Sequence, residues 1–245
     1  EELNESKKNE VKMKEKEEHE NEVKRLSELF IDPRKIKMEE DIGKRPFDQG
    51  AHKITYKGSI HRNHHEQEMT VAIKVRPINI ITDSNIQSLF VGFEAQSSLK
   101  HIAILPLIGF STPTEDSKMY REITPFMPNS SLDELITNVY KGNAPSDWEL
   151  IRSIIIFGTA AGIACIHQHG FIHRDFKPGN IWLDEQYHPK IGDFSISCVC
   201  QKGGMMYNGD SNGSPLYMAP EICQNDSYNH KIDVFSYSII LYQLL

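Results

Sequence analysis

The amino-acid sequence predicts an α+β fold with two lobes, because a strand-rich first half is followed by a mainly helical second half. Short segments rich in β-branched and aromatic residues fill much of the chain before residue 127. The segment 144–170 instead carries apolar residues at helical spacing along its whole length. At 245 residues and 39% hydrophobic composition, the chain can bury one two-lobed core or two small cores.

The first half is expected to hold a polar hairpin and one helix among its strands. The loop 61–68 is polar and joins two strand-like segments, and the loop 111–118 separates two more. In chain order the expected elements are strands at 52–60 and 69–75, a helix at 85–100, and strands at 104–110 and 119–126.

The second half is organised around the helix expected at 144–170. Ser146 and Glu149 have the spacing of a capping box, and Gly170 stands where a left-handed residue ends a helix. After it we expect short strands at 180–184 and 189–194, a loop rich in Gly, Ser and Asn at 201–214, and a final helix at 231–245.

The two ends of the chain differ from its middle. Residues 1–38 are expected to form a charged linker or helix, because apolar residues in the first 25 positions are too sparse for a sustained heptad. A coiled coil is the weaker alternative there. The last residues stop inside an apolar helical pattern, so we expect this sequence to be a piece of a longer chain.

Composition argues against several classes of protein. A net charge of −7 disfavours a nucleic-acid partner bound through phosphate contacts. Cys198 and Cys200 are interpreted as reduced thiols, and the alternative of a metal site is weaker because no second ligand pair follows at zinc spacing. No secretory signal and no apolar run of about 18 residues are found, so we expect a cytoplasmic protein without a membrane segment.

The segment 171–180, "FIHRDFKPGN", crowds three polar side chains into a turn between two apolar strands. Asp175 could accept the proton of an attacking hydroxyl, and Lys177 could neutralise charge on a phosphoryl group. Asn180 could offer its carbonyl oxygen to Mg²⁺, and Asp193, at the end of the next strand, could offer a carboxylate to the same ion.

A second group of residues suits a nucleotide cleft. Strand alternation places Ala72 and Lys74 on one face of the strand at 69–75. Ala72 leaves room for a flat ring, and Lys74 can reach phosphates. A lysine in a dry cleft needs a partner, and Glu94 on the following helix is suitably placed.

These features together resemble the signature set of the eukaryotic protein kinase family. The matching segments, in sequence order, are "VAIK" (71–74), Glu94, "HRDFKPGN" (173–180), "DFS" (193–195) and "APE" (219–221). The resemblance covers about residues 39–245. It implies a small antiparallel-sheet lobe at about 39–127 and a mainly helical lobe at about 128–245, whose last helices the family places beyond the final residue here.

The resemblance also implies roles for the charged residues. ATP and Mg²⁺ would lie between the lobes, with Lys74 paired to Glu94 and bound to the phosphates. Asp175 would be the catalytic aspartate, and Asn180 and Asp193 the metal ligands.

Two further segments imply the type of kinase. Lys177 and the segment "GSPLYMAPE" (213–221) look like those of serine/threonine kinases that act on protein substrates. The segments "ITPFMPNSSLDELI" (123–136) and "KIDVFSYSIILYQLL" (231–245) look most like the tyrosine-kinase-like group.

The adenine side of the cleft can be assigned in the same way. Thr124 falls at the gatekeeper position, and Pro125 and Met127 follow in the hinge, where the Met127 N–H is expected to face the adenine ring. Trp182 stands under the base, where the family usually has Leu. Gly50 is the one glycine of the family's phosphate loop that matches, at residues 48–55, so weaker ATP binding is expected.

Regulation is implied by the neighbour of the catalytic aspartate. Arg174 resembles the arginine that clamps an activating phosphate, for which Ser211 and Ser214 are the candidate acceptors. His173 resembles a packed structural histidine, and Asp233 resembles the helix aspartate that braces the catalytic loop.

Three functions remain open from the sequence. An ATP-dependent serine/threonine protein kinase accounts for all the charged residues. A pseudokinase that binds nucleotide or partners is the alternative, because the glycine loop, Ser195 and Trp182 depart from the family pattern. A small-molecule kinase is the least favoured, because "GSPLYMAPE" is a feature of kinases with protein substrates.

Overall fold

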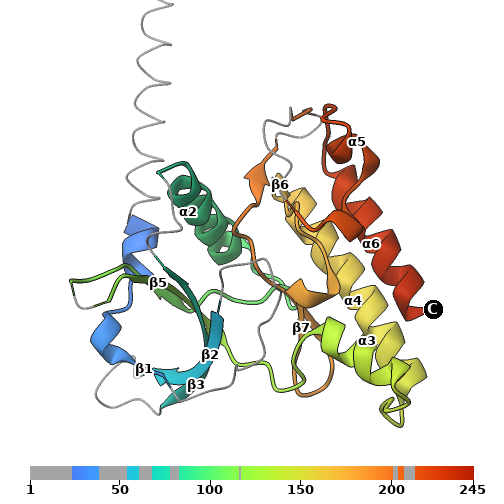
Figure 1. The fold of residues 1–245 in the computed structure, drawn as a ribbon, viewed down its shortest axis with the longest axis horizontal. Coiled ribbons are helices and arrows are strands. Elements are labelled where there is room, and N and C mark those ends of the chain that lie inside the picture. The colour runs from blue at the N-terminus through green and yellow to red at the C-terminus, as the bar shows by residue number, and fades with distance from the viewer. Residues whose placement is uncertain are drawn as a thin grey trace, which may run out of the picture.

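The computed structural model describes residues 24–38, 54–60, 68–77, 83–115, 117–200, 204–206 and 213–245. It confirms the expected α+β architecture with two lobes. Figure 1 shows two bodies side by side. One contains the sheet and α2, and the other is formed by α3, α4, α5 and α6. The cleft between the two bodies is lined by residues of both.

The small lobe is built on a five-stranded antiparallel sheet with the strand order β1-β2-β3-β5-β4. Val71, Ile73 and Val75 of β3 are buried on one face, so Ala72 and Lys74 face the other way, as the alternation predicts. The strands are β1 (Ile36–Met38), β2 (Ile54–Ile60), β3 (Met69–Pro77), β4 (Gly109–Ser111) and β5 (Met119–Pro125).

Helix α2 (Asp83–Ser98) packs on the sheet through Leu89 and Phe93, which contact Phe110 of β4 in one buried cluster. The segment before the sheet also contacts Phe110. Ile31 donates its N–H to the carbonyl of Phe110 at 2.8 Å, and Phe110 donates to the carbonyl of Leu29 at 2.9 Å. The sheet and its edge thus include residues from before the boundary expected at residue 39.

The large lobe is mainly helical, with two short two-stranded sheets. Its core joins Ile155 and Ile166 of α4 to Ile191 of β8 and Ile240 of α6. The elements are α3 (Leu132–Tyr140), α4 (Trp148–Gln168), β6 (Phe171–Ile172), β7 (Ile181–Leu183), β8 (Pro189–Ile191), β9 (Cys198–Val199), α5 (Pro220–Cys223) and α6 (Lys231–Leu244), with β6 paired to β9 and β7 to β8.

Helix α4 has the length and apolarity of a membrane-spanning helix. In this fold it lies among α3, α6 and the β7–β8 hairpin (Figure 1). Its residues Ile155, Ile163 and Ile166 are buried in the core of the large lobe. The packing accounts for the apolar residues on the buried face of the helix, whereas Leu150 and Phe157 on its other face are exposed.

Two details differ from the sequence expectations. The strand expected at 104–110 is limited to β4, because Pro106 has no N–H for a ladder, and Ile104 instead bridges to Ile191 of β8. The prediction of a capping box at Ser146 and Glu149 is wrong. Helix α4 begins at Trp148, its N-cap makes no side-chain hydrogen bond, and the Glu149 carboxylate binds Arg152.

The C-terminal end of α4 is as expected. Gly170 follows the C-cap with a φ of +78°, a left-handed conformation that glycine adopts without a Cβ clash. It turns the chain directly into β6 and the catalytic loop.

Gly92 allows α2 to approach the large lobe. A Cβ at this position would lie 2.4 Å from the carbonyl oxygen of Phe194. Alanine gains up to about 1 kcal/mol of helix propensity, but overpacking costs about 1–3 kcal/mol. We therefore expect Gly92→Ala to lower the melting temperature of the full-length protein. Ser97→Ala on the same helix is the control, and an equal melting temperature for the two variants would contradict the close approach.

Candidate functional site

The loop between β6 and β7, which the sequence predicts to be the catalytic loop, is held by Asp233 of α6. The Asp233 carboxylate accepts the backbone N–H of His173 at 2.9 Å and that of Arg174 at 3.0 Å, and it contacts His167 at 2.8 Å. Arg174 has a φ of +66°, which is strained for a residue with a side chain. Asp233 is buried, so its hydrogen bonds stabilise this conformation as the sequence analysis expected.

His173 is a packing residue. Its ring is fully buried and lies edge-on to Phe176 and Phe194, with centroids 5.4 and 4.9 Å away. Asp175 donates its backbone N–H to Nδ1 at 3.3 Å, so Nε2 carries the hydrogen and donates to the carbonyl of Gly192 at 3.0 Å. The ring therefore links the catalytic loop to the strand before Asp193.

Asp175, Lys177 and Asn180 converge on one another. Asn180 donates from Nδ2 to the Asp175 carboxylate at 2.9 Å and to its backbone carbonyl at 2.7 Å. The Lys177 ammonium lies 3.4 Å from the same carboxylate. All three side chains are buried or half-buried, so these contacts hold the Asp175 carboxylate in one orientation.

Ser214 joins this cluster, although the sequence marked it as a phosphate acceptor. Its hydroxyl donates to Asp175 Oδ1 at 2.8 Å and accepts from Lys177 Nζ at 2.8 Å. The Arg174 guanidinium is engaged elsewhere, because Nε donates to the carbonyl of Ile196 at 2.5 Å and a terminal nitrogen donates to the Tyr228 hydroxyl at 3.1 Å. Ser214 therefore contacts Asp175 in this structure, and its role as a phosphate acceptor stays a prediction.

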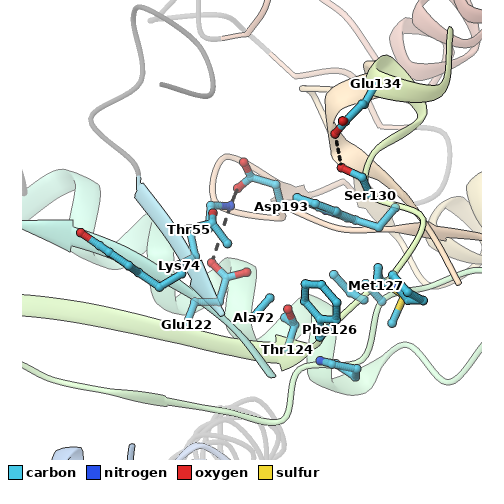
Figure 2. Close-up of a pocket in the computed structure, with 15 residues that line it drawn as sticks. Thr55, Ala72, Lys74, Glu122, Thr124, Phe126, Met127, Ser130, Glu134 and Asp193 are labelled. Atoms are coloured by element: carbon cyan, nitrogen blue, oxygen red, sulfur yellow. Dashed lines mark hydrogen bonds and ion pairs between the residues drawn. The ribbon is translucent and has the colours of Figure 1, made fainter. Parts of the chain in front are cut away.

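Lys74 crosses the cleft to Asp193. The ammonium lies 2.6 Å from Asp193 Oδ1 and 3.8 Å from Glu122 Oε2 (Figure 2). Ser195 adds a hydroxyl donor to Asp193 Oδ1 at 2.8 Å, a contact that glycine at this position cannot make. Glu94 is half-buried on α2, and its expected pairing with Lys74 stays a prediction.

Sequence reasoning missed Glu122 and Arg76. Glu122 lies directly opposite Lys74 in the β3–β5 register, and Arg76 lies two residues after Lys74 on the same face of β3. Both are buried, with exposed fractions of 5% and 9%. Arg76 could have been predicted from the sequence, because the alternation that places Ala72 and Lys74 on the cleft face of β3 also places Arg76 on that face.

The adenine side of the cleft is a cavity of about 290 Å³. Its polar end is formed by Lys74, Glu122 and Asp193, and its apolar part includes Ala72 and Thr124 (Figure 2). Seven residues selected from the sequence line it, namely Ala72, Lys74, Thr124, Pro125, Met127, Trp182 and Asp193. A largely apolar cavity with a few charged groups at one end suits a flat ring attached to phosphates.

Asn180 and Asp193 fit a divalent cation. Asn180 uses Nδ2 to hold Asp175, which leaves its carbonyl oxygen available as a ligand. Its backbone carbonyl accepts the N–H of Gly192 at 2.9 Å, so Asp193 is held beside it. In the part of the chain that the structure describes, no group of three or more His, Cys, Asp or Glu could hold a metal. Two oxygen ligands suit Mg²⁺ bound together with phosphates and water.

The sequence also singles out two single residues and one cysteine pair. Gly50 and Ser211 lie outside the described residues. Cys198 and Cys200 are free thiols. Burial raises the pKa of the Cys198 thiol, although nearby Arg174 acts in the opposite direction, so the thiol stays protonated at neutral pH.

Comparison with known proteins defines the class. The profile of the protein kinase domain matches residues 55–245, which is well over half of the chain, so the chain belongs to the protein kinase domain family. This confirms the family that the sequence motifs resemble.

Several curated relatives carry kinase names. The leaf rust 10 disease-resistance locus receptor-like protein kinase-like 2.4 of Arabidopsis thaliana is 29% identical over 80% of this chain and 31% of its own length. The dual specificity protein kinase shkB of Dictyostelium discoideum is 29% identical over 80% of this chain and 28% of its own. A putative serine/threonine-protein kinase/receptor of Acanthamoeba polyphaga mimivirus is 34% identical over 61% of this chain and 8% of its own. The chain therefore spans less than a third of the length of these relatives.

The brace at Asp233 can be tested by its removal. Asp233→Ala leaves two buried backbone N–H groups without their acceptor, and each such group costs about 1–3 kcal/mol. We expect the free energy of unfolding, measured by urea titration, to fall by at least about 2 kcal/mol. Asp147→Ala is the control, because Asp147 is exposed and makes no side-chain cap bond. A similar small loss for both variants would contradict the role of Asp233.

Proposed function

We propose that the protein is an ATP-dependent serine/threonine protein kinase, which transfers the γ-phosphate of ATP to hydroxyl groups of protein substrates. The observation that supports this most strongly is that Asp175, Lys177 and Asn180 contact one another, while the Asn180 carbonyl binds Gly192, the neighbour of Asp193, and Asp193 in turn binds Lys74. These groups come from three separate segments of the chain, namely β3, the loop between β6 and β7, and the segment after β8. Their arrangement matches the positions that phosphoryl transfer requires.

The catalytic loop acts on the substrate hydroxyl. The Asp175 carboxylate, oriented by Asn180 and Ser214, accepts the hydrogen bond of the hydroxyl and orients its oxygen for attack. Lys177 places its positive charge 3.4 Å from this carboxylate, where it also faces the phosphoryl group in transfer. Most of the rate enhancement comes from positioning and charge neutralisation, because phosphoryl transfer requires little covalent work from the protein.

The other wall of the cleft binds the nucleotide. The adenine ring occupies the cavity beside Ala72, with the hinge carbonyl of Pro125 and the N–H of Met127 as its hydrogen-bond partners. Lys74 binds the phosphates, and its ion pair with Asp193 holds it at the polar end of the cavity. Asn180 and Asp193 would hold Mg²⁺, which would supply positive charge to the phosphates.

The specificity for serine and threonine is supported by Lys177 and Ser214. The Lys177 ammonium joins Asp175 to Ser214, so the substrate-facing loop is bound to the catalytic aspartate. The mimivirus relative is named a putative serine/threonine-protein kinase/receptor, whereas the Dictyostelium relative is named a dual specificity kinase. Peptides with serine, threonine or tyrosine therefore belong in the same assay.

A nucleotide-binding scaffold without catalysis is the second candidate. One observation favours it: Asp193 Oδ1 already receives Lys74, Ser195 and Arg76, at 2.6, 2.8 and 3.4 Å. A carboxylate held by three donors is a weaker metal ligand than a less engaged one. Activity measurements separate the two functions.

Asp175→Asn tests the catalytic function. The amide cannot accept the hydroxyl proton, so transfer is expected to fall about 10²- to 10⁴-fold. The measurement is phosphate incorporation from labelled ATP with Mg²⁺, by the full-length protein and into the three peptides. Asp147→Asn, at an exposed position, is the control. Equal, negligible incorporation by the unmodified protein and by Asp175→Asn would overturn the kinase in favour of the scaffold.

Ser214 separates a positioning role from a phosphate-acceptor role. Loss of a hydrogen bond to a charged group costs about 1.5–3 kcal/mol, so Ser214→Ala should lower the rate about 10- to 100-fold. Ser214→Thr keeps the hydroxyl and should retain most activity. Ser214→Glu places a carboxylate against Asp175 and should abolish transfer. If Ser214→Glu instead matched or exceeded the unmodified rate, Ser214 would be an activating phosphorylation site.

A further inference from the structure

Arg76 and Glu122 are two buried charges that the proposed mechanism does not use. They lie on neighbouring strands, β3 and β5, on the face that lines the cleft. Their side chains are 11% and 6% exposed. A buried charge is retained at a cost unless it is paired and hydrogen-bonded, so the contacts of these residues indicate what they do.

The two residues complete a closed ring of alternating charge with Lys74 and Asp193. Arg76 donates to Glu122 Oε2 at 3.0 Å, and it reaches Asp193 Oδ1 at 3.4 Å. Lys74 in turn lies 2.6 Å from the same Asp193 oxygen and 3.8 Å from the same Glu122 oxygen. Figure 2 shows Glu122 and Asp193 on either side of the Lys74 ammonium. The ring contains two cations and two carboxylates, so its net charge is zero.

The ring bears directly on the metal ligand. Asp193 is the carboxylate that the proposed function assigns to Mg²⁺, and Arg76 approaches one of its oxygens with a fixed positive charge. A guanidinium at a carboxylate favours the same charged state that a metal ion requires, but it occupies the oxygen and repels the cation. Arg76 therefore both orients the ligand and competes with the ion.

Glu122 makes this competition reversible. When Asp193 turns to a cation, Arg76 remains bound to Glu122 at the shorter of its two distances. The arginine is then not left as an unpaired buried charge, which is a costly state. Without Glu122, Arg76 loses the carboxylate that holds it when Asp193 is taken by the ion.

We propose that Arg76 and Glu122 are positioning residues that set the concentration of divalent cation at which Asp193 becomes a metal ligand. Arg76 raises that concentration by binding Asp193, and Glu122 lowers it by offering Arg76 a second partner. This inference rests on the proposed function, because it takes Asp193 as the ligand of the cation that accompanies a nucleotide.

The test is the binding of Mn²⁺ in the presence of ADP, measured by electron paramagnetic resonance on the full-length protein. Arg76→Met is expected to lower the Mn²⁺ dissociation constant about threefold or more, because the competing charge is gone. Glu122→Gln is expected to raise it by about tenfold, because Arg76 then binds Asp193 alone. The two effects have opposite signs, which loss of stability in both variants cannot produce.

The double variant keeps the test decisive if a single variant unfolds. Replacing both partners of a buried pair is tolerated better than removing one. The double variant R76M/E122Q should bind Mn²⁺ nearly like Arg76→Met, because Arg76 is the nearer partner of Glu122, at 3.0 Å against 3.8 Å for Lys74, so the two effects should be non-additive. Arg152→Met and Glu149→Gln are the control for an ion pair outside the cleft, and their Mn²⁺ binding should be unchanged.

The outcomes separate this inference from the proposed function. Shifts of the same sign, additive shifts, or no shift relative to the control pair overturn the role of Arg76 and Glu122. Absence of Mn²⁺–ADP binding in the unmodified protein overturns both proposals. The expected shifts without any phosphate transfer support the ring at Asp193 and overturn the kinase activity alone.

Discussion

The ion pair between Lys74 and Asp193 is the contact on which the site depends. It joins β3 of the small lobe to the segment after β8 of the large lobe, across 2.6 Å. Both side chains are largely buried, so the pair has a larger electrostatic interaction than it would have at the surface, and each charge needs the other. The two lobes thereby present their polar groups to the same space.

Contacts within the large lobe hold the loop between β6 and β7 and the segment that carries Asp193 in place. Asp233 fixes the strained backbone at Arg174, and His173 links the loop between β6 and β7 to the segment that carries Asp193. Each polar group in this chain of contacts satisfies another, which is the condition for keeping charges inside a protein. The strain at Arg174 is therefore offset by the hydrogen bonds of residues 173 and 174 to Asp233 of α6.

Much of the fold and the site could be predicted from the sequence. Strand alternation placed Ala72 and Lys74 correctly, because one face of β3 must enter the core and the other is left for the cleft. The order of the motifs along the chain predicted that Asp175, Asn180 and Asp193 belong to one site. Gly170 was also predicted, since few residues other than glycine adopt its left-handed backbone conformation.

The remaining features depend on contacts that sequence spacing does not encode. Glu122 pairs with Lys74 through a strand register that is known only once β3 and β5 are aligned. Ser214 reaches Asp175 across an intervening segment of nearly forty positions, so its hydroxyl was assigned to regulation. Pro106 shortened a strand because the loss of its N–H outweighed the apolar pattern around it.

The most direct measurement of the account is a crystal structure of the full-length protein with Mg²⁺ and a non-hydrolysable ATP analogue. The account predicts phosphate oxygens at the Lys74 ammonium, and a cation at about 2.0–2.1 Å from the side-chain oxygens of Asn180 and Asp193. The Asp175 carboxylate should face the terminal phosphate. A nucleotide bound outside this cleft, or bound within it while Lys74, Asn180 and Asp193 point away from the phosphates, would contradict the assignment.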